Sequence, residues 1–220
     1  MTQTIVTGAS AVFPGCVYYA DIDEKLVALT IDDGPDSVVT RDILFVLQKY
    51  NAKATFFLIG NRVTNNKQVV SQIIEQGHEL GNHMLTGETT ICLPHDEFTR
   101  QFIQTDSILS EFSDVHWLRP GSGWYSDDML KYLAENDKSY QCVLGSVYPF
   151  DAQIPSSVFS TVFISINIRP GSIIVLHDRG ERGRRTVKTI SRIIPKLQEK
   201  GYRFVTLSEL FRTNNNDNME

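Results

Sequence analysis

Cysteine is scarce in this sequence and forms no recognisable pattern. The three cysteines, Cys16, Cys92 and Cys142, lack the spacing of metal-binding cysteines. An odd number also fits poorly with a secreted domain that is held together by disulfides. We therefore expect reduced thiols, and we expect Cys142, which lies on a predicted buried strand, to serve core packing.

Long apolar runs, a surplus of positive charge and an export signal are also lacking. No apolar segment approaches the length of a membrane-spanning helix, so we expect no membrane partner. The net charge of −5 argues against a nucleic-acid surface, and the one basic cluster, residues 179–185, is short. Residues 1–15 lack a basic region followed by an apolar core. This favours a cytoplasmic protein unless an export signal has been removed. The sequence does not indicate the oligomeric state.

Strand and helix signals alternate along most of the chain. Apolar runs predict strands at 26–31, 54–58, 141–144, 172–176 and 203–206, with shorter ones at 78–81 and 115–118. Helical patterns lie between them, at 38–50, 67–76, 96–111, 127–136 and 184–200. The apolar runs are continuous rather than alternating, which indicates strands that are buried on both faces.

These elements predict a single-domain α/β fold. Strand–helix units without a nucleotide-binding fingerprint favour a distorted (β/α) barrel of about seven parallel strands. We place this barrel at residues 26–212, after an N-terminal extension at 1–25 and before a polar tail at 213–220. No internal repeat or interdomain linker interrupts it.

Ionisable side chains follow the ends of the predicted strands, where barrel enzymes keep their chemistry. The most informative are Asp32 and Asp33, directly behind the first strand and before Gly34-Pro35. Adjacent carboxylates resist joint ionisation, so such a pair indicates a nearby metal or cation. Later strand ends supply His83, Arg119, Asp151 and His177. A lone buried histidine is more often structural than a ligand, and we expect this of His78.

Five of these segments resemble, in order and spacing, the motifs of the polysaccharide deacetylase family, carbohydrate esterase family four. They are residues 30–35, 77–83, Arg119-Pro120, Asp151 and Leu176-His177. The resemblance spans residues 26–211, nearly the whole chain. It implies a distorted barrel hydrolase that removes acetyl groups from the amide nitrogen of an amino sugar or glycan, such as a chitin-like or peptidoglycan substrate.

The resemblance also implies an acid–base mechanism. Asp32 would be the base that activates water, and Arg119 would keep its carboxylate ionised and oriented. His177 would protonate the leaving nitrogen, a task suited to the side chain that titrates nearest neutral pH. Asp151 would support His177.

The implied metal site departs from the family pattern. Asp33 and His83 match two ligands of a divalent ion, usually zinc, but Gly87 stands where the family has a second histidine. Glu88 is the nearest replacement and would complete an Asp-His-Glu site, whose oxygen ligands suit manganese or cobalt as well. It is alternatively a solvated loop charge. His95 is a weaker candidate for the missing metal ligand.

The residues predicted to line the pocket also depart from the family pattern. Ala152 replaces an expected tryptophan, and Tyr148 stands where many family members have an aspartate. Trp124 and Tyr125 either line a sugar-binding surface or pack at the barrel rim. Two alternatives to a glycan deacetylase therefore stay open. One is a metal-free pseudoenzyme barrel that binds a glycan, and the other is a hydrolase of a small non-carbohydrate amide.

Overall fold

The structure of the chain is a computed structural model that describes residues 14–135 and 138–217. The segment 1–13, which carries most of the region inspected for an export signal, lies outside the described residues. Among the residues that are described, no helix has the length and apolar character needed to cross a membrane.

Eight strands form one sheet in this part of the chain. They are β1 (Cys16–Val17), β2 (Leu26–Gly34), β3 (Thr55–Leu58), β4 (Glu79–Asn82), β5 (Trp117–Leu118), β6 (Gln141–Val143), β7 (Ile173–His177) and β8 (Arg203–Val205). All strand pairs are parallel, in the order β1-β6-β5-β4-β3-β2-β7. Strand β8 pairs with residues 26–28 at the start of β2. Strand β3 pairs with the later part of β2, from Thr30 to Gly34. The single-domain α/β fold class is confirmed.

The segment after β6 connects the sheet to β7 and gives it the curvature of a distorted barrel. Val147 and Ile174 form a parallel bridge. The main-chain N–H groups of Ser146 and Val147 both donate to the carbonyl of Ile173, and the N–H of Val175 donates to the carbonyl of Val147. Because β6 and β7 lie toward opposite ends of the strand order, this contact brings the two sides of the sheet together.

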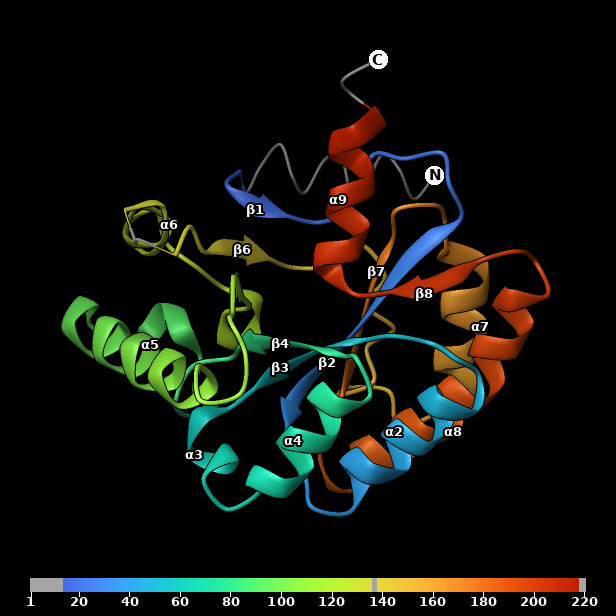
Figure 1. The fold of residues 1–220 in the computed structure, drawn as a ribbon, viewed down its shortest axis with the longest axis horizontal. Helices are drawn as coiled ribbons and strands as arrows, with labels where there is room; N and C mark the ends of the chain where they lie inside the picture. The colour runs from blue at the N-terminus through green and yellow to red at the C-terminus, as the bar shows by residue number, and fades with distance from the viewer. Residues whose placement is uncertain (1–13, 136–137, 218–220) are drawn as a thin grey trace.

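Helices surround this sheet (Figure 1). They are α2 (Val39–Lys49), α3 (Gly60–Val63), α4 (Lys67–Glu75), α5 (His95–Leu109), α6 (Asp127–Ala134), α7 (Ser157–Asn167), α8 (Gly180–Gln198) and α9 (Leu207–Asp217), with 3₁₀ turns η1 (Thr90–Cys92) and η2 (Gly121–Gly123). Helix α8 shows why they pack here: Ile190, Ile193 and Leu197 are buried at helical spacing, which gives it an apolar face. Helices α2 and α8 lie side by side, with α5 on the other side of the molecule.

The sheet begins before residue 26, where the sequence analysis started the barrel. Strand β1 lies within the segment 1–25, and helix α9 continues to Asp217, past the start of the predicted polar tail. Helix α7 was not anticipated. Its sequence, SVFSTVFISIN, has no charged residue, and its valine, isoleucine and phenylalanine side chains are as compatible with a strand as with a helix.

The expectation of reduced thiols is wrong for two of the three cysteines. Cys16 and Cys142 form a disulfide, because the parallel register of β1 and β6 places these two residues opposite each other. They are 126 positions apart in the chain, so no local spacing indicates the pairing. Cys92 is free and exposed.

Candidate active site

Strand β2 ends in a bulge that brings two neighbouring carboxylates to the same pocket. Successive side chains of a regular strand point to opposite faces, so Asp32 and Asp33 would otherwise diverge. The register with β3 shifts between Asp32 and Gly34, and Asp33 has a φ of 70°. An extra residue of this kind redirects a side chain, and aspartate tolerates the left-handed conformation better than most residues. Both carboxylates thus line one pocket of about 680 Å³.

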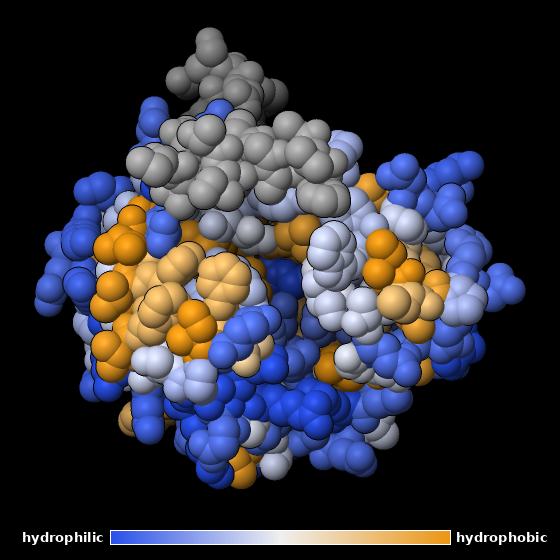
Figure 2. All heavy atoms as spheres, turned by 180° about the vertical axis from the view of Figure 1, so that it is seen from behind, coloured by the Kyte–Doolittle hydropathy of each residue, from blue (hydrophilic) through white to orange (hydrophobic). Residues whose placement is uncertain are grey.

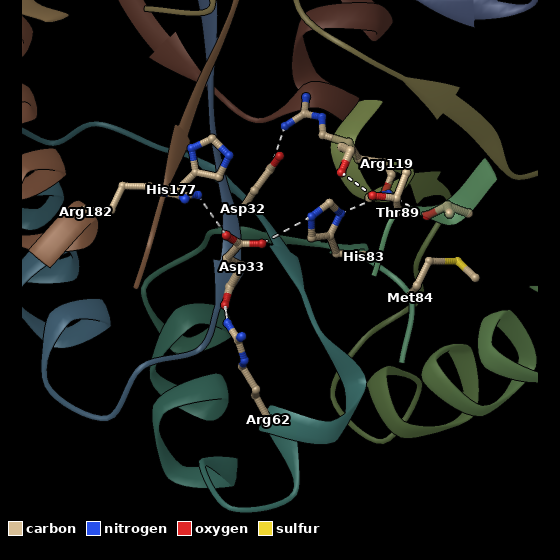
Figure 3. A network of polar contacts seen from close by, with 12 residues as sticks. Asp32, Asp33, Arg62, His83, Met84, Thr89, Arg119, His177 and Arg182 are labelled. Carbon is tan, nitrogen blue, oxygen red and sulfur yellow. Dashed lines mark hydrogen bonds and ion pairs between the residues drawn. The ribbon is translucent and has the colours of Figure 1, made fainter. Parts of the chain in front are cut away.

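Asp32 is held by a buried arginine. Arg119 Nη1 donates to Asp32 Oδ1 at 2.7 Å and to Thr30 Oγ1 at 2.6 Å. Its Nε and Nη2 donate to the carbonyls of Val143 and Leu144. The side chains of Arg119 and Asp32 are only 3% and 5% exposed. A buried charge is tolerated when it is paired and hydrogen-bonded, and this arrangement holds the Asp32 carboxylate in a fixed position (Figure 3).

His177 stands beside Asp32 at the end of the neighbouring strand. The two residues are register partners on β7 and β2. His177 Nδ1 lies 2.9 Å and 3.0 Å from the two carboxylate oxygens of Asp151, which is buried. A carboxylate at Nδ1 orients the imidazole and leaves Nε2 available to exchange a proton with a bound molecule. The structure thus brings together all four residues of the predicted acid–base mechanism.

Asp33 and His83 form the second pair in the pocket. His83 Nε2 lies 3.6 Å from Asp33 Oδ1, and His83 Nδ1 is 2.7 Å from the carbonyl oxygen of Arg119. Two further arginines reach Asp33: Arg182 Nη1 is 3.2 Å from Asp33 Oδ2, and Arg62 donates to the Asp33 carbonyl oxygen. Figure 3 shows these guanidinium groups approaching Asp33 from different sides.

The neighbouring charges determine the electrostatics of this pair. Burial acts to raise the pKa of the Asp33 carboxyl, but the hydrogen bond and charge of His83, with the charges of His177 and Arg182, hold it well below its usual range. Burial acts to lower the pKa of His83, but Asp33 and Asp32 raise it. Asp33 and His83 therefore stabilise each other as an ion pair.

Glu88 does not join this pair. Its side chain is exposed and lies outside the pocket lining, and its Oε2 accepts from Thr86 Oγ1 at 3.0 Å and from Gln101 Nε2 at 3.5 Å. Within residues 14–135 and 138–217, no three His, Cys, Asp or Glu side chains are grouped closely enough to hold a metal ion. Catalytic zinc sites use three protein ligands, so Asp33 and His83 alone do not fit such a site. The role of Glu88 as a ligand stays a prediction.

Two histidines considered in the sequence analysis, His95 and His78, lie apart from the pocket lining. His95 begins α5, and its ring faces Tyr132 at 6.3 Å. His78 lies before β4, at the opposite end of the strand from His83, and its Nδ1 accepts from the Ala54 N–H at 3.3 Å. Burial and the charge of Lys53 lower the pKa of His78 to about 4, so it is neutral. This is the structural role expected for it.

Aromatic residues form part of the pocket wall. Trp124 and Tyr148 line the pocket together with Ala152, and Trp124 is 53% exposed. Tyr125 instead donates a hydrogen bond to the Pro14 carbonyl at 3.1 Å, so of the two predicted aromatic residues only Trp124 lines the pocket. The face drawn in Figure 2 is hollowed near its centre, with hydrophilic side chains at the bottom of the hollow.

The sequence analysis missed three arginines of the pocket lining, Arg62, Arg179 and Arg182. The cluster 179–185 was judged only as a candidate nucleic-acid surface. Its position directly after His177 was the available signal, because residues that follow a barrel strand lie at the catalytic face. Arg62, on α3, had no comparable signal.

Known proteins show the same fold and sequence pattern. The family model for polysaccharide deacetylases matches residues 20–140, more than half of the chain. The chain belongs to the polysaccharide deacetylase family. A peptidoglycan-N-acetylglucosamine deacetylase of Bacillus cereus is 35% identical, and the match covers 86% of this chain and 90% of that protein. The family and the hydrolase class predicted from the five motifs are thereby confirmed.

Solved structures of the family agree on the fold and differ in activity. The structure of the Bc1960 peptidoglycan N-acetylglucosamine deacetylase has a TM-score of 0.86 at 32% identity and covers 93% of this chain and 96% of that one. BA3943, a family four pseudoenzyme from Bacillus anthracis, has a TM-score of 0.80 at 28% identity, with coverage of 90% and 69%. An acetyl xylan esterase from Clostridium thermocellum, in complex with cobalt, has a TM-score of 0.78 at 33% identity, with coverage of 86% and 91%.

Proposed function

We propose that this protein hydrolyses the N-acetyl group of an amino sugar in a peptidoglycan-type or chitooligosaccharide-type glycan. The observation that carries the proposal is the pairing of Asp32 with Arg119 and of His177 with Asp151 at the ends of two neighbouring strands. One pair supplies a carboxylate held by a guanidinium group, and the other supplies an oriented imidazole. The names of the relatives support this class of substrate.

The two pairs supply the proton transfers of amide hydrolysis. A water molecule attacks the acetyl carbon and gives a proton to Asp32, which Arg119 holds in position. When the carbon–nitrogen bond breaks, His177 gives a proton to the departing nitrogen, and the products are acetate and the free amino sugar. Asp151 stabilises the imidazolium form of His177 during this transfer.

A second candidate function is glycan binding without turnover. Gly87 stands where the family has its second metal-binding histidine, and Arg182 contacts the Asp33 oxygen that does not face His83. Both features leave the pair Asp33–His83 without a third ligand. The relative from Bacillus anthracis carries the name pseudoenzyme, and a mutant of it has restored enzymatic activity, which supports treating this alternative as a real one.

Acetate release separates the two functions. Purified protein is incubated with chitooligosaccharides and with peptidoglycan, after dialysis against a chelator and after addition of zinc, manganese or cobalt. Acetate release that Asp32→Asn abolishes supports the deacetylase. Saturable glycan binding without acetate release under any metal condition rejects the deacetylase and supports the binding protein. Release of acid from small cyclic amides or ureides, but not from glycans, supports the non-carbohydrate alternative.

A further inference from the structure

Helix α7 exposes an apolar face to solvent. Residues 152–168, which include this helix, contain no charged side chain. Val158, Val162 and Ile166 are 52–74% exposed, and their spacing of four residues places them on one face. Ser160 and Ile164 are buried on the opposite face. A helix at the surface of a globular protein ordinarily turns polar side chains outward, so α7 departs from that pattern.

Aromatic rings connect this face to the wall of the pocket. The ring centre of Phe163 lies 5.9 Å from that of Phe159 and 5.9 Å from that of Phe150. The ring of Phe150 is in turn 5.1 Å from that of Tyr148, which lines the pocket. Figure 2 shows an apolar patch to the left of the central hollow, on the side where α7 lies. The exposed face of α7 and the mouth of the pocket therefore share one side of the molecule.

Helix α8, which packs against α7, carries a row of cations beside this face. The members of the row are three or four residues apart, so they lie on one side of the helix. They are Arg185, Lys188, Arg192 and Lys196. Arg192 Nη1 donates to Ser157 Oγ at 2.9 Å, and Arg185 Nη2 donates to the carbonyl of Asp151 at 3.5 Å. These two contacts place the row beside the start of α7.

The acidic side chains in these surroundings do not pair with the middle of the row. They are Asp21, Asp23, Asp151, Asp178, Glu181 and Glu199. Asp151 and Asp178 are buried. Glu181 pairs with Arg184, and Glu199 follows the last residue of α8. Asp21 and Asp23 line a separate pocket that includes the last residue of α7. Lys188 and Arg192 make no ion pair among the residues that the structure describes.

An apolar face that is bordered by unpaired cations has the chemistry of a helix at a lipid surface. Valine, isoleucine and phenylalanine side chains enter the boundary between the head groups and the acyl chains. Lysine and arginine extend their charged ends to the head groups, and anionic lipids attract them. A helix that lies in the surface needs no membrane-spanning length. The expectation of no membrane partner concerned spanning segments, so it does not bear on this helix.

Two other occupants fit this face less well. A second copy would bring the same patch, and therefore the same cations, into the interface. A protein partner is usually anchored by tryptophan, tyrosine or arginine side chains, and α7 contains none of these. An anionic lipid surface instead suits both the aliphatic side chains of α7 and the cations of α8.

We infer that the exposed face of α7, with the cations of α8 beside it, docks this protein on the surface of a bilayer that contains anionic lipids. Docking in this way holds the mouth of the pocket near the membrane, because the pocket and this face share one side of the molecule. The inference goes beyond the proposed function. It concerns where the protein acts and does not depend on acetate release.

The test is sedimentation with vesicles of phosphatidylcholine alone or of phosphatidylcholine mixed with phosphatidylglycerol. We expect binding to the anionic vesicles to be about tenfold tighter or more, and to weaken as salt screens the attraction. Val162→Ser combined with Ile166→Ser should weaken it about tenfold or more, since both side chains leave water on docking. Lys188→Gln combined with Arg192→Gln should weaken it about 10-fold to 30-fold, the effect of two cations near an anionic surface.

Matched control variants lie on the other side of the molecule (Figure 1). Ile103→Ser on α5 removes an exposed apolar side chain, and Lys131→Gln on α6 removes an exposed cation. Both should bind the anionic vesicles as the unchanged protein does. Thermal unfolding checks that each variant is folded, which we expect because all the substituted side chains are exposed.

The outcomes separate the lipid surface from the other occupants. No binding to anionic vesicles, or equal binding by the α7 variant and the unchanged protein, overturns the inference. Equal binding to both kinds of vesicle overturns the assignment of anionic lipids. A dimer that the α7 variant abolishes, seen by light scattering in protein that binds no vesicles, makes the face an interface between copies instead. Asp32→Asn should bind vesicles like the unchanged protein, so a failure of docking and a failure of deacetylation are observed separately.

Discussion

The acid–base residues and the predicted metal ligands form two halves of the pocket. The halves differ in how completely their charged side chains find interaction partners within the chain. In the acid–base half, Asp32 has Arg119 and His177 has Asp151, each at 2.7–2.9 Å and with at least one partner buried. The other half holds the predicted metal ligands and is called the metal half. There, Asp33 faces His83 at 3.6 Å and also contacts Arg182 and Arg62. The first half has one arrangement that satisfies its charges. The second has competing partners and lacks a third ligand.

This difference shows that two adjacent residues of one motif can have quite different interaction partners. Asp32 and Asp33 are adjacent in sequence, yet one is fixed by a single buried guanidinium and the other is partly exposed among several cations. A role that is inferred from a motif therefore holds for a residue only when the interaction partners of that residue are also present. The experiments below test whether the two halves differ in solution as they do in the structure.

The largest expected effect is at Asp32. Asp32→Asn removes the proposed base and should lower acetate release by about 10²-fold to 10⁴-fold, the usual contribution of a general base. Asp33→Asn is the matched variant, and we expect a loss of about tenfold, because Asp33 lacks a complete ligand set. The measurement is acetate release per protein, with thermal unfolding as a check that Arg119 tolerates the loss of its charge partner. Equal losses in the two variants would show that the metal half is as complete as the acid–base half.

Gly87→His should complete the metal half. A Cβ at this position fits, because it would meet only Ile59 at 3.5 Å and Arg62 at 4.0 Å, which are ordinary contacts. We expect bound zinc to rise to about one equivalent per chain, since the variant offers the three protein ligands of a catalytic site. Elemental analysis measures this. Gly87→Ala fills the same space without a ligand and should leave the metal content unchanged; a rise there would contradict the ligand explanation.

The disulfide should stabilise the acid–base half in particular. Strand β6, which Cys142 joins to β1, ends at Val143, and the carbonyls of Val143 and the following Leu144 hold Arg119. Cys16→Ser should lower the free energy of unfolding by about 2–5 kcal/mol, the usual effect of removing a native disulfide. Denaturant unfolding measures the loss. Cys92→Ser is the control, and a change there beyond about 0.5 kcal/mol would argue that the effect is not due to the bridge.

Asp178, next to His177, should make stability depend on pH. Burial raises the pKa of Asp178 from its usual value of 3.8 to about 7. The folded state therefore binds more protons than the unfolded chain between these values, so this contribution is fully present at low pH and is lost as the pH rises through 7. We expect the protein to be more stable at pH 5 than at pH 8 by about 1–4 kcal/mol relative to Asp178→Asn, which has no such proton to lose.

Denaturant unfolding of both proteins at the two pH values measures the difference. His78 acts in the opposite direction, because its pKa of about 4 in the folded state is below the usual value, and it is common to both proteins. The comparison between them therefore isolates Asp178. Identical pH profiles of the two proteins would reject this assignment.

The smallest expected effect is at Glu88. Its carboxylate faces Thr86 and Gln101 outside the pocket, so Glu88→Ala should change metal content and acetate release by less than about twofold, as expected for a surface charge. Elemental analysis of the variant and the unchanged protein, side by side, tests this. Loss of all bound metal in Glu88→Ala would instead establish the Asp-His-Glu site considered from the sequence.

Most strands and the order of the site residues could be predicted because their signals are local. A continuous apolar run such as 26–31 indicates a buried strand wherever the rest of the chain lies, and the carboxylates after it mark its catalytic end. Helix α7 and the disulfide could not be predicted in this way. The first depends on the sheet against which the helix packs, and the second on a register between residues that are 126 positions apart.

The amino-acid sequence by itself determined the family and the alternation of strands and helices, and it named the candidate acid–base residues, because all of these depend on residue types at fixed spacing. Only the tertiary structure decided which charges meet. The bulge at Asp33 brings two successive side chains to one pocket, the fold brings Arg182 to the Asp33 carboxylate and Arg62 to its main-chain carbonyl, and the loop after His83 directs Glu88 away. Electrostatic pairing depends on distance in space, and distance along the chain does not predict it.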